Sequence, residues 1–416
     1  VGSEMCIRDR HDIIHRFMKQ EPSLLVQSLA QSQTLAMSQK SAELRARGVD
    51  VINLSVGEPD FYTPQHIKEA AKAAVDANFS FYSPVPGYMS LRRAVSAKLE
   101  RENGVTFAPE QIVVGNGAKQ ALCNSILAIA NPGDEVVIPT PAWVSYIEMV
   151  KMSRATVVTV PAGIDTDFKV TPAQLEAAIT NRTRIVLLCS PSNPTGSVYT
   201  RDELQALVDV IARHERIIVI SDEIYEHINF AGGFTSLASF DELCDRVVVI
   251  NGVSKAYAMT GWRIGYCAAP LWVAKAVTKL QGQYTSGASS IAQKAAEAAY
   301  NGPQDCVVEM CAAFRRRRDL VVEMARAIPG LRINEPQGAF YLFPEVSAYI
   351  GRKAPDGTVI ADSGALAMYL LHEAHVATVD GAAFSAPGYI RLSYATSDDN
   401  LREAMRRIAA ALGRLA

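Results

Sequence analysis

The chain has 416 residues, of which 49% are hydrophobic and 20% are charged, as is usual for a globular protein. Its 41 basic and 43 acidic residues give a formal net charge of −2, so no basic excess indicates a nucleic-acid partner. No apolar run is long enough to predict a membrane span, and the seven scattered cysteines show no CxxC or Cys/His spacing typical of a disulfide framework or a zinc site. We therefore expect a cytoplasmic protein with reduced thiols and no metal, nucleic-acid or membrane partner.

The N-terminal part divides into two segments. Residues 1–22 are predicted to be a non-native or flexible extension, because they lack the apolar core of a signal peptide and the first ten resemble translated non-native sequence. The start is expected at Met5 or Met18. Residues 23–56 are expected to form a segment that packs with a small domain at the other end of the chain.

The middle of the chain predicts an α/β domain at residues 57–302. Short apolar runs predict strands at 111–117, 135–141, 155–161, 184–191, 216–223, 246–252 and 263–270. Amphipathic patterns, such as those at 119–130 and 201–214, predict helices between several of them. Strands that are apolar throughout and separated by helices indicate a mostly parallel sheet that is covered on both faces.

The pattern changes after residue 302 and predicts a smaller α+β domain at residues 303–416. An arginine-rich helix covers 311–328, and a second helix is expected at 363–374. A strand pair at 376–384 and 389–396 follows, and then a terminal helix.

Chemically distinct groups follow the predicted strands at their carboxyl ends, where ligands bind in parallel α/β sheets. They combine an anion-binding helix start, an aromatic ring, an amide, a carboxylate, a phenol and an amine, carried by Gly117, Ala118, Lys119, Trp143, Asn193, Asp222, Tyr225 and Lys255. Each has an ordinary structural explanation by itself: Trp143 in the core, Asn193 in a turn, Asp222 as a helix cap. Because these explanations do not account for all the groups at one edge, the pattern predicts a shared binding site.

Pyridoxal phosphate is a ligand that uses every member of this set. Its aldehyde needs a lysine amine for a Schiff base, its ring nitrogen needs a carboxylate that keeps it protonated, and its phosphate needs a helix N-terminus and an arginine. Lys255 lies among small residues in "NGVSKAYAMTGWRIGY", and Arg263 follows in the same segment. We therefore predict Lys255 as the nucleophile and Arg263 as the phosphate ligand. A nicotinamide-dependent dehydrogenase is disfavoured, because no G-x-G-x-x-G motif is present.

At this point the chain resembles the class I (fold-type I) aminotransferases of the aspartate aminotransferase group. The resemblance covers roughly residues 30–400 and rests on segments in family order, among them "INLSVGEPDF", "YSPVPGYMSLR", "GNGAKQAL", "PAWVSY", "SPSNPTG", "SDEIYEH", "PQGAFY" and "RLSYATS". It implies a mostly parallel seven-stranded sheet flanked by helices, a smaller α+β domain and pyridoxal 5′-phosphate as the cofactor.

The resemblance also implies a role for each matching residue. Lys255 resembles the lysine that binds the cofactor and shuttles the proton. Asp222 resembles the partner of the cofactor's ring nitrogen, and Tyr225 and Asn193 resemble the ligands of the cofactor's O3′. Asn193 is also implied to lie near the substrate. Trp143 resembles the ring-stacking residue, and the phosphate region is implied at Gly117, Ala118, Lys119 and Arg263. Tyr82 resembles a residue that reaches the phosphate of the neighbouring subunit. Arg391, with the N–H of Gly57, resembles the site that binds the substrate's α-carboxylate. Tyr82 implies a homodimer with shared active sites. The family often has serine where this chain has Gly252, which removes one phosphate hydrogen bond that Ser254 need not replace.

The resemblance further implies a dicarboxylate substrate. Lys119 resembles a lysine linked to the distal carboxylate, and Thr34 resembles a threonine that assists it, so we expect aspartate and 2-oxoglutarate to give oxaloacetate and glutamate. Prephenate or arogenate fits the same lysine, Trp143 could admit aromatic amino acids, and Lys119 could instead serve only phosphate or solvent. Decarboxylation or β-elimination with the same cofactor stays open. A regulator on this fold is disfavoured, because too few residues precede the resemblance for a DNA-binding domain.

Overall fold

The computed structural model describes residues 21–416, so the expectations about a start at Met5 or Met18 lie outside the described residues. The chain divides into a segment that ends at Gln31 and a compact unit, Ser32–Ala416. In the first, α2 (Leu24–Ser28) begins after Ser23, whose side chain accepts a hydrogen bond from the N–H of Val26. Among residues 21–416, no helix combines the length and the apolar composition that crossing a membrane requires.

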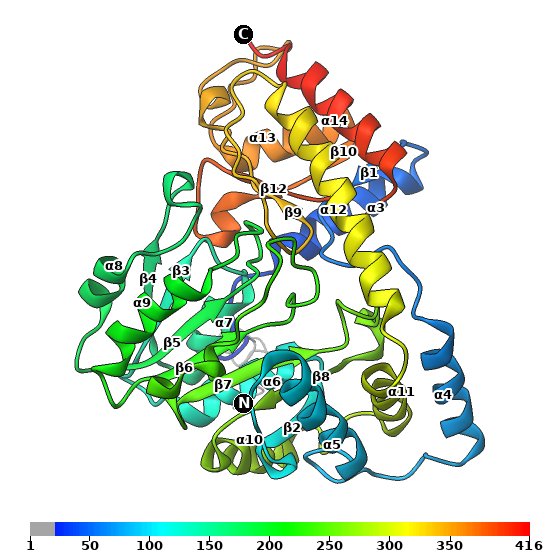
Figure 1. Cartoon of the computed structure of the whole chain (residues 1–416). Helices are drawn as coiled ribbons and strands as arrows, with labels where there is room; N and C mark the ends of the chain where they lie inside the picture. The colour runs from blue at the N-terminus through cyan, green and yellow to red at the C-terminus, as the bar shows by residue number, and fades with distance from the viewer. Residues whose placement is uncertain (1–20) are drawn as a thin grey trace, which may run out of the picture. The chain divides into compact units, whose positions relative to one another are not determined.

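A seven-stranded sheet dominates the compact unit (Figure 1). Its strands in spatial order are β2 (Ile112–Asn116), β8 (Ile264–Ala268), β7 (Val247–Gly252), β6 (Ile218–Asp222), β5 (Thr183–Cys189), β3 (Glu135–Thr140) and β4 (Thr156–Pro161). Only β8 runs antiparallel to its neighbours in this sheet, and the other pairs are parallel. The predicted mostly parallel seven-stranded sheet is therefore confirmed, with each strand inside or within a residue of its predicted range.

Helices cover the sheet on both faces, which explains why its strands are apolar throughout. In β7, Val248 and Ile250 belong to the core on one face, whereas Val247 and Val249 belong to the core on the other. The first face is covered by α6 (Ala118–Ile129), α7 (Ser145–Ser153) and α10 (Leu271–Tyr284). The second is covered by α4 (Gln65–Asp76), α5 (Met89–Lys98), α8 (Pro172–Ala178), α9 (Arg201–Ala212) and α11 (Ser290–Asn301). Each fully buried valine or isoleucine stabilises the fold by about 1.5–3 kcal/mol relative to an exposed one.

The C-terminal region has its own hydrophobic core around a small antiparallel sheet. This sheet contains β11 (Val379–Asp380), β12 (Ile390–Ser393) and β9 (Tyr341–Leu342) in that order, and the helices around it are α12 (Asp305–Arg326), α13 (Ser363–Tyr369) and α14 (Asp398–Leu412). The expected strand at 376–384 is interrupted: β10 (Val376–Ala377) pairs elsewhere, and a tight helical turn, Gly381–Phe384, follows β11. Asp380 accepts a hydrogen bond from the N–H of Ala382, which stabilises this turn in place of a longer strand.

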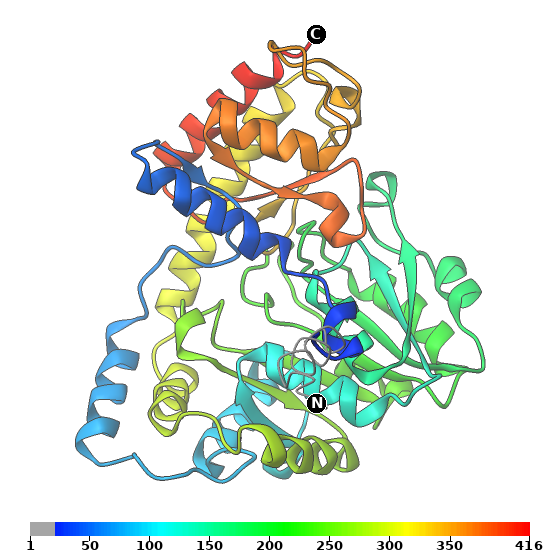
Figure 2. The same ribbon diagram turned by 180° about the vertical axis from the view of Figure 1, so that it is seen from behind.

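Residues 33–53 pack against the C-terminal region. β1 (Ile52–Asn53) pairs in parallel with β10, and α3 (Gln33–Ala46) contributes Met37 to a small core with Ala367 and Leu371. Figures 1 and 2 show α3 in blue beside the orange and red C-terminal helices from both sides. The boundaries of the predicted domains at residues 56/57 and 302/303 stay a prediction.

Candidate active site

A cavity of about 410 Å³ opens where β5, β6 and β7 end and α6 begins. Most of the predicted site residues line it: Thr34, Gly57, Ala118, Lys119, Trp143, Asn193, Asp222, Tyr225, Lys255, Arg263 and Arg391. They come from α3, from the loop after β1, from the ends of the large sheet and from β12. The fold therefore brings together residues that lie far apart in the sequence.

Asp222 is the last residue of β6 and is buried, with 5% of its surface exposed. The hydroxyl of Tyr146 donates a hydrogen bond to its Oδ2 at 2.6 Å, and the N–H of Ile224 donates to its Oδ1 at 3.3 Å. Burial raises the pKa of Asp222 above its ordinary value, although both hydrogen bonds and Lys255 act in the opposite direction. A buried carboxylate in this state suits a cationic ligand group, which would stabilise its charged form.

Lys255 lies in the turn after β7 and is partly buried. Its amine donates a hydrogen bond to the backbone carbonyl of Gly57. Burial lowers the pKa of Lys255 to about 8; Glu58 opposes this shift, whereas Arg391 and Arg263 contribute to it. At pH 7 roughly a tenth of this amine is therefore uncharged and nucleophilic, far more than for an ordinary lysine.

Gly117 and Arg263 lie against each other and form a corner at the start of α6. Gly117 has φ +81°, and an added Cβ there would overlap the guanidinium of Arg263. That guanidinium donates to the carbonyl of Thr260 at 2.8 Å and to that of Asn116 at 3.3 Å, which fixes its position. The first N–H groups of a helix have no partner within the helix, so this corner combines backbone donors, the helix dipole and a permanent positive charge.

Arg391 lies on β12 and is buried, with 1% exposed. Its Nη1 donates to Oδ1 of Asn193 at 2.9 Å, its Nη2 donates to the carbonyl of Ser55 at 2.7 Å, and it lies 4.5 Å from the ring centroid of Tyr341. Its buried Nε has no hydrogen-bond partner, and no carboxylate of the described chain forms an ion pair with it. A buried guanidinium without an acidic partner is suited to bind a carboxylate ligand.

Lys119 also lines the pocket and forms no ion pair with another residue in the range 21–416. Its Nζ lies 4.9 Å from the ring centroid of Trp143. Burial lowers the pKa of Lys119, Arg263 lowers it further, and Cys123 acts in the opposite direction. Thr34 lines the same cavity. Lys119 is thus available to a negatively charged ligand group in the pocket.

Several contacts of the site were not predicted from the sequence. Tyr341 on β9 exchanges a hydrogen bond of 2.8 Å with the hydroxyl of Tyr225 and also contacts Arg391, and Tyr146 on α7 binds Asp222. Both tyrosines occur in segments that carry the resemblance, "PQGAFY" and "PAWVSY", and this was the only indication of their role.

Two other predicted positions do not line the cavity of this chain. Gly117 lies immediately before Ala118, against Arg263, as described above. Tyr82 is 96% exposed and is not among the cavity-lining residues.

The position of Gly252, where the family often has serine, is tightly packed. A Cβ at Gly252 would lie 2.7 Å from Cα of Gly265, so a serine there would require the backbone of β7 or β8 to move.

Residues 49–408 match the model of the family described as aminotransferase class I and II. The chain is 51% identical over 381 residues to the aspartate/prephenate aminotransferase of Cereibacter sphaeroides. The matched region covers 91% of this chain and 95% of that protein. The crystal structure of the aspartate aminotransferase from Rhizobium meliloti matches with a TM-score of 0.92 and 43% identity, covering 95% of this chain and 100% of that one. The aspartate aminotransferase from Thermus thermophilus with maleate matches with a TM-score of 0.87 and 42% identity, covering 94% and 100%.

Proposed function

The chain belongs to the class I and II aminotransferases, and from this premise we propose that it transfers the amino group of aspartate to 2-oxoglutarate, giving oxaloacetate and glutamate. The observation that carries the choice of substrate is the pair of cations Arg391 and Lys119, which line one cavity without an acidic partner among the described residues. All four reactants carry two carboxylates. Arg391 would bind the α-carboxylate and Lys119, assisted by Thr34, the distal one.

Enzymes of this family use pyridoxal 5′-phosphate, and the residues of the cavity fit it. The corner of Gly117 and Arg263, which a Cβ would fill, suits the phosphate, and the amine of Lys255 suits the aldehyde. The cofactor would be held by Lys255, Asp222, Tyr225, Asn193, Trp143, Ala118, Lys119 and Arg263. When bound, it carries the amino group between the two substrates and stabilises negative charge at the substrate Cα.

The side chains of the site would perform the remaining work. Arg391 and the N–H of Gly57 would orient the substrate through its α-carboxylate. Lys255 Nζ, uncharged, would accept the proton from the substrate Cα and deliver it again. Asp222, held by Tyr146, would keep a positive charge on the ligand's ring nitrogen. Movement of the proposed small domain, residues 303–416, over the cavity would exclude water.

Prephenate is a second candidate acceptor. The relative from Cereibacter sphaeroides is named an aspartate/prephenate aminotransferase. The cavity of this chain also has apolar surface from Leu35, Leu122 and Trp143, which would accommodate a ring, while Lys119 would bind the second carboxylate of prephenate.

We also propose a homodimer with shared active sites. Tyr82 is 96% exposed and Phe81 is 80% exposed, and neither lines the cavity of its own chain, so both are free to contact a second subunit. Mixing a Lys255→Ala variant with a Tyr82→Phe variant should restore activity, because a hybrid dimer then has one intact site. No recovery in a verified hybrid dimer would contradict shared sites.

The cytoplasm is the proposed compartment. The described cysteines are Cys123, Cys189, Cys244, Cys267, Cys306 and Cys311, and all of them are free thiols, which is compatible with a reducing environment. Fractionation of the native cells with antibodies against this chain would test the assignment.

A comparison of amino donors tests the proposed reaction. Purified holoenzyme is supplied with 2-oxoglutarate and aspartate, alanine or phenylalanine, and the 2-oxo acid product is quantified. Aspartate should give the highest kcat/KM, and preference for alanine would overturn the dicarboxylate assignment. Release of carbon dioxide or ammonia in place of a 2-oxo acid would overturn transamination. Replacing 2-oxoglutarate by prephenate then tests the second candidate.

A further inference from the structure

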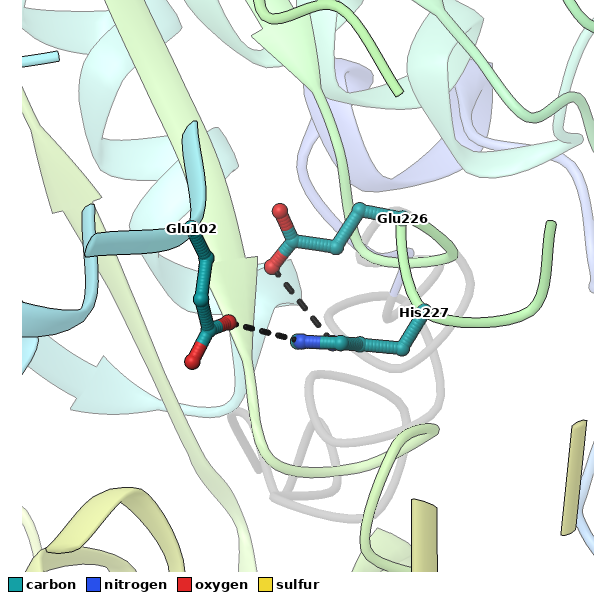
Figure 3. A group of neighbouring side chains, drawn as sticks. All are labelled: Glu102, Glu226 and His227. Carbon is teal, nitrogen blue, oxygen red and sulfur yellow. Dashed lines mark hydrogen bonds and ion pairs between the residues drawn. The ribbon is translucent and has the colours of Figure 1, made fainter. Parts of the chain in front are cut away.

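The end of β6 and the turn that follows it carry side chains of two kinds. Asp222 and Tyr225 line the cavity, whereas Glu226 does not and is buried, with 6% exposed. Figure 3 shows Glu226 and His227 beside Glu102. The Nε2 of His227 lies 2.9 Å from a carboxylate oxygen of Glu102. The segment that holds two proposed cofactor ligands is therefore also anchored in a charged cluster outside the cavity.

Lys98, the last residue of α5, brings a positive charge to this cluster. Its side chain is completely buried. Its Nζ donates hydrogen bonds to Oε1 of Glu226 and, at 2.7 Å, to Oδ1 of Asn103. Asn103 in turn donates to Oε2 of Glu226 at 2.6 Å. Burial by itself would raise the pKa of Glu226, but Lys98 and His227 lower it below its ordinary value. Although Glu102, Glu226 and His227 could form a metal-ligand set, Lys98 already neutralises Glu226.

Glu226 also connects the turn after β6 to the end of β7. Backbone pairing between these strands reaches Asp222, and the N–H of Glu223 donates to the carbonyl of Ile250 at 2.9 Å. Beyond this point the Nδ2 of Asn251 donates to Oε1 of Glu226 at 2.8 Å. The Oδ1 of Asn251 accepts a hydrogen bond from the N–H of Gly252 at 2.7 Å, at the start of the turn that carries Lys255. This side-chain link continues the connection after the backbone ladder ends.

We propose that Glu226, neutralised by Lys98, and Asn251 are positioning residues that fix the segment of Asp222 and Tyr225 relative to the segment of Lys255. The inference rests on the proposed function, because it assigns the cofactor's ring and its aldehyde to these two segments. A shift between them would misplace the amine relative to the ring, although neither Glu226 nor Asn251 lines the cavity.

The first test is Asn251→Ala, studied in the holoenzyme by cofactor affinity and by the pH dependence of the cofactor's visible absorbance. We expect the Kd of pyridoxal phosphate to rise about ten- to hundredfold, as for a lost hydrogen bond to a charged group, and the midpoint of the absorbance change to shift. The control is Asn124→Ala, which removes another buried asparagine side chain, on α6, far from the Glu226 contact in sequence. It should lower the Tm without changing either cofactor property.

A matched pair of double variants separates the effect of the hydrogen bond from that of the charge. It also tests the positioning role if Asn251→Ala does not fold. Lys98→Met with Glu226→Gln removes the ion pair but keeps an acceptor for Asn251, so both cofactor properties should stay close to wild type. Lys98→Met with Glu226→Leu removes the acceptor as well and should weaken binding like Asn251→Ala. Equal cofactor properties in the two double variants, or an Asn251→Ala enzyme that resembles Asn124→Ala, would overturn the proposal.

The wild-type protein separates this inference from the proposed function. If borohydride treatment and peptide mapping leave Lys255 of the wild-type holoenzyme unmodified, the proposed function fails. If Lys255 is modified and the variants behave like their controls, only the positioning role fails.

Discussion

Replacing Lys119 by methionine removes one positive charge from the pocket and keeps a side chain of similar length. The Nζ of Lys119 lies 4.9 Å from the ring centroid of Trp143, so the substitution also removes a cation–π contact. That contact contributes about 0.5–1 kcal/mol, and because it does not involve the substrate, its loss should affect aspartate and other amino acids equally. A hydrogen bond between charged groups contributes about 1.5–3 kcal/mol. If Lys119 binds the distal carboxylate, aspartate should therefore lose a further 10- to 150-fold in kcat/KM, approximately.

The assay must avoid 2-oxoglutarate, because this acceptor also carries a distal carboxylate. Holoenzyme is mixed with a single amino acid, and the half-reaction is followed through the cofactor's absorbance at saturating cofactor. Aspartate is compared with phenylalanine, which has no distal charge, and the Kd of the cofactor is measured in parallel. Because Arg263 lowers the pKa of Lys119, the two cations lie close enough to interact, and Lys119 could serve the phosphate instead. An equal loss for both amino acids, together with weaker cofactor binding, would refute the substrate role.

Three further outcomes are expected. The rate of cofactor association with the apoprotein should rise with pH and reach half its maximum near pH 8, because the pKa of Lys255 is about 8 and its protonated form is an unreactive ammonium. Stopped-flow measurements that show no such rise, or the same rise in Lys255→Ala, would contradict this. Gly252→Ser should lower the free energy of unfolding by about 1–3 kcal/mol through overlap with Gly265, and unchanged stability in urea titrations would argue against it. Tyr146→Phe should raise the cofactor Kd about tenfold, because Asp222 loses its 2.6 Å hydrogen bond; an unchanged Kd would show that Asp222 needs no such support.

The large sheet could be predicted from the sequence because its signals are local. Each strand is a short apolar run, and alternate residues of β7 are buried in the cores on both faces. Once the strands are parallel, the residues after their ends must meet at one edge, which is why Asn193, Asp222 and Lys255 could be assigned to a common site. The interruption of the strand at 376–384 was missed because β10 pairs with β1, which lies in a distant part of the chain.

Contacts between distant side chains could not be predicted in the same way. The bond between Tyr225 and Tyr341 joins residues 116 positions apart, and that between Lys98 and Glu226 joins residues 128 positions apart. Near the end of a helix, Lys98 has the pattern of a solvent-exposed residue, and its ion pair with Glu226, 128 positions away, makes its burial possible. Sequence patterns indicate which face of an element is buried, but not which exceptional charge is buried with it.

The buried charges of this protein differ in how they are compensated, and the difference indicates what each one does. Lys98 and Glu226 neutralise each other within the protein, so their contribution is structural and independent of any ligand. Arg391 is equally buried, but its hydrogen-bond partners among the described residues are neutral, and burial raises the pKa of Asp222. Both of these charges lower the stability of the ligand-free protein, and a carboxylate at Arg391 or a cationic ring at Asp222 would recover that free energy. Ligand binding and folding are therefore coupled at these two residues, whereas the pair of Lys98 and Glu226 provides the rigid support against which that coupling acts.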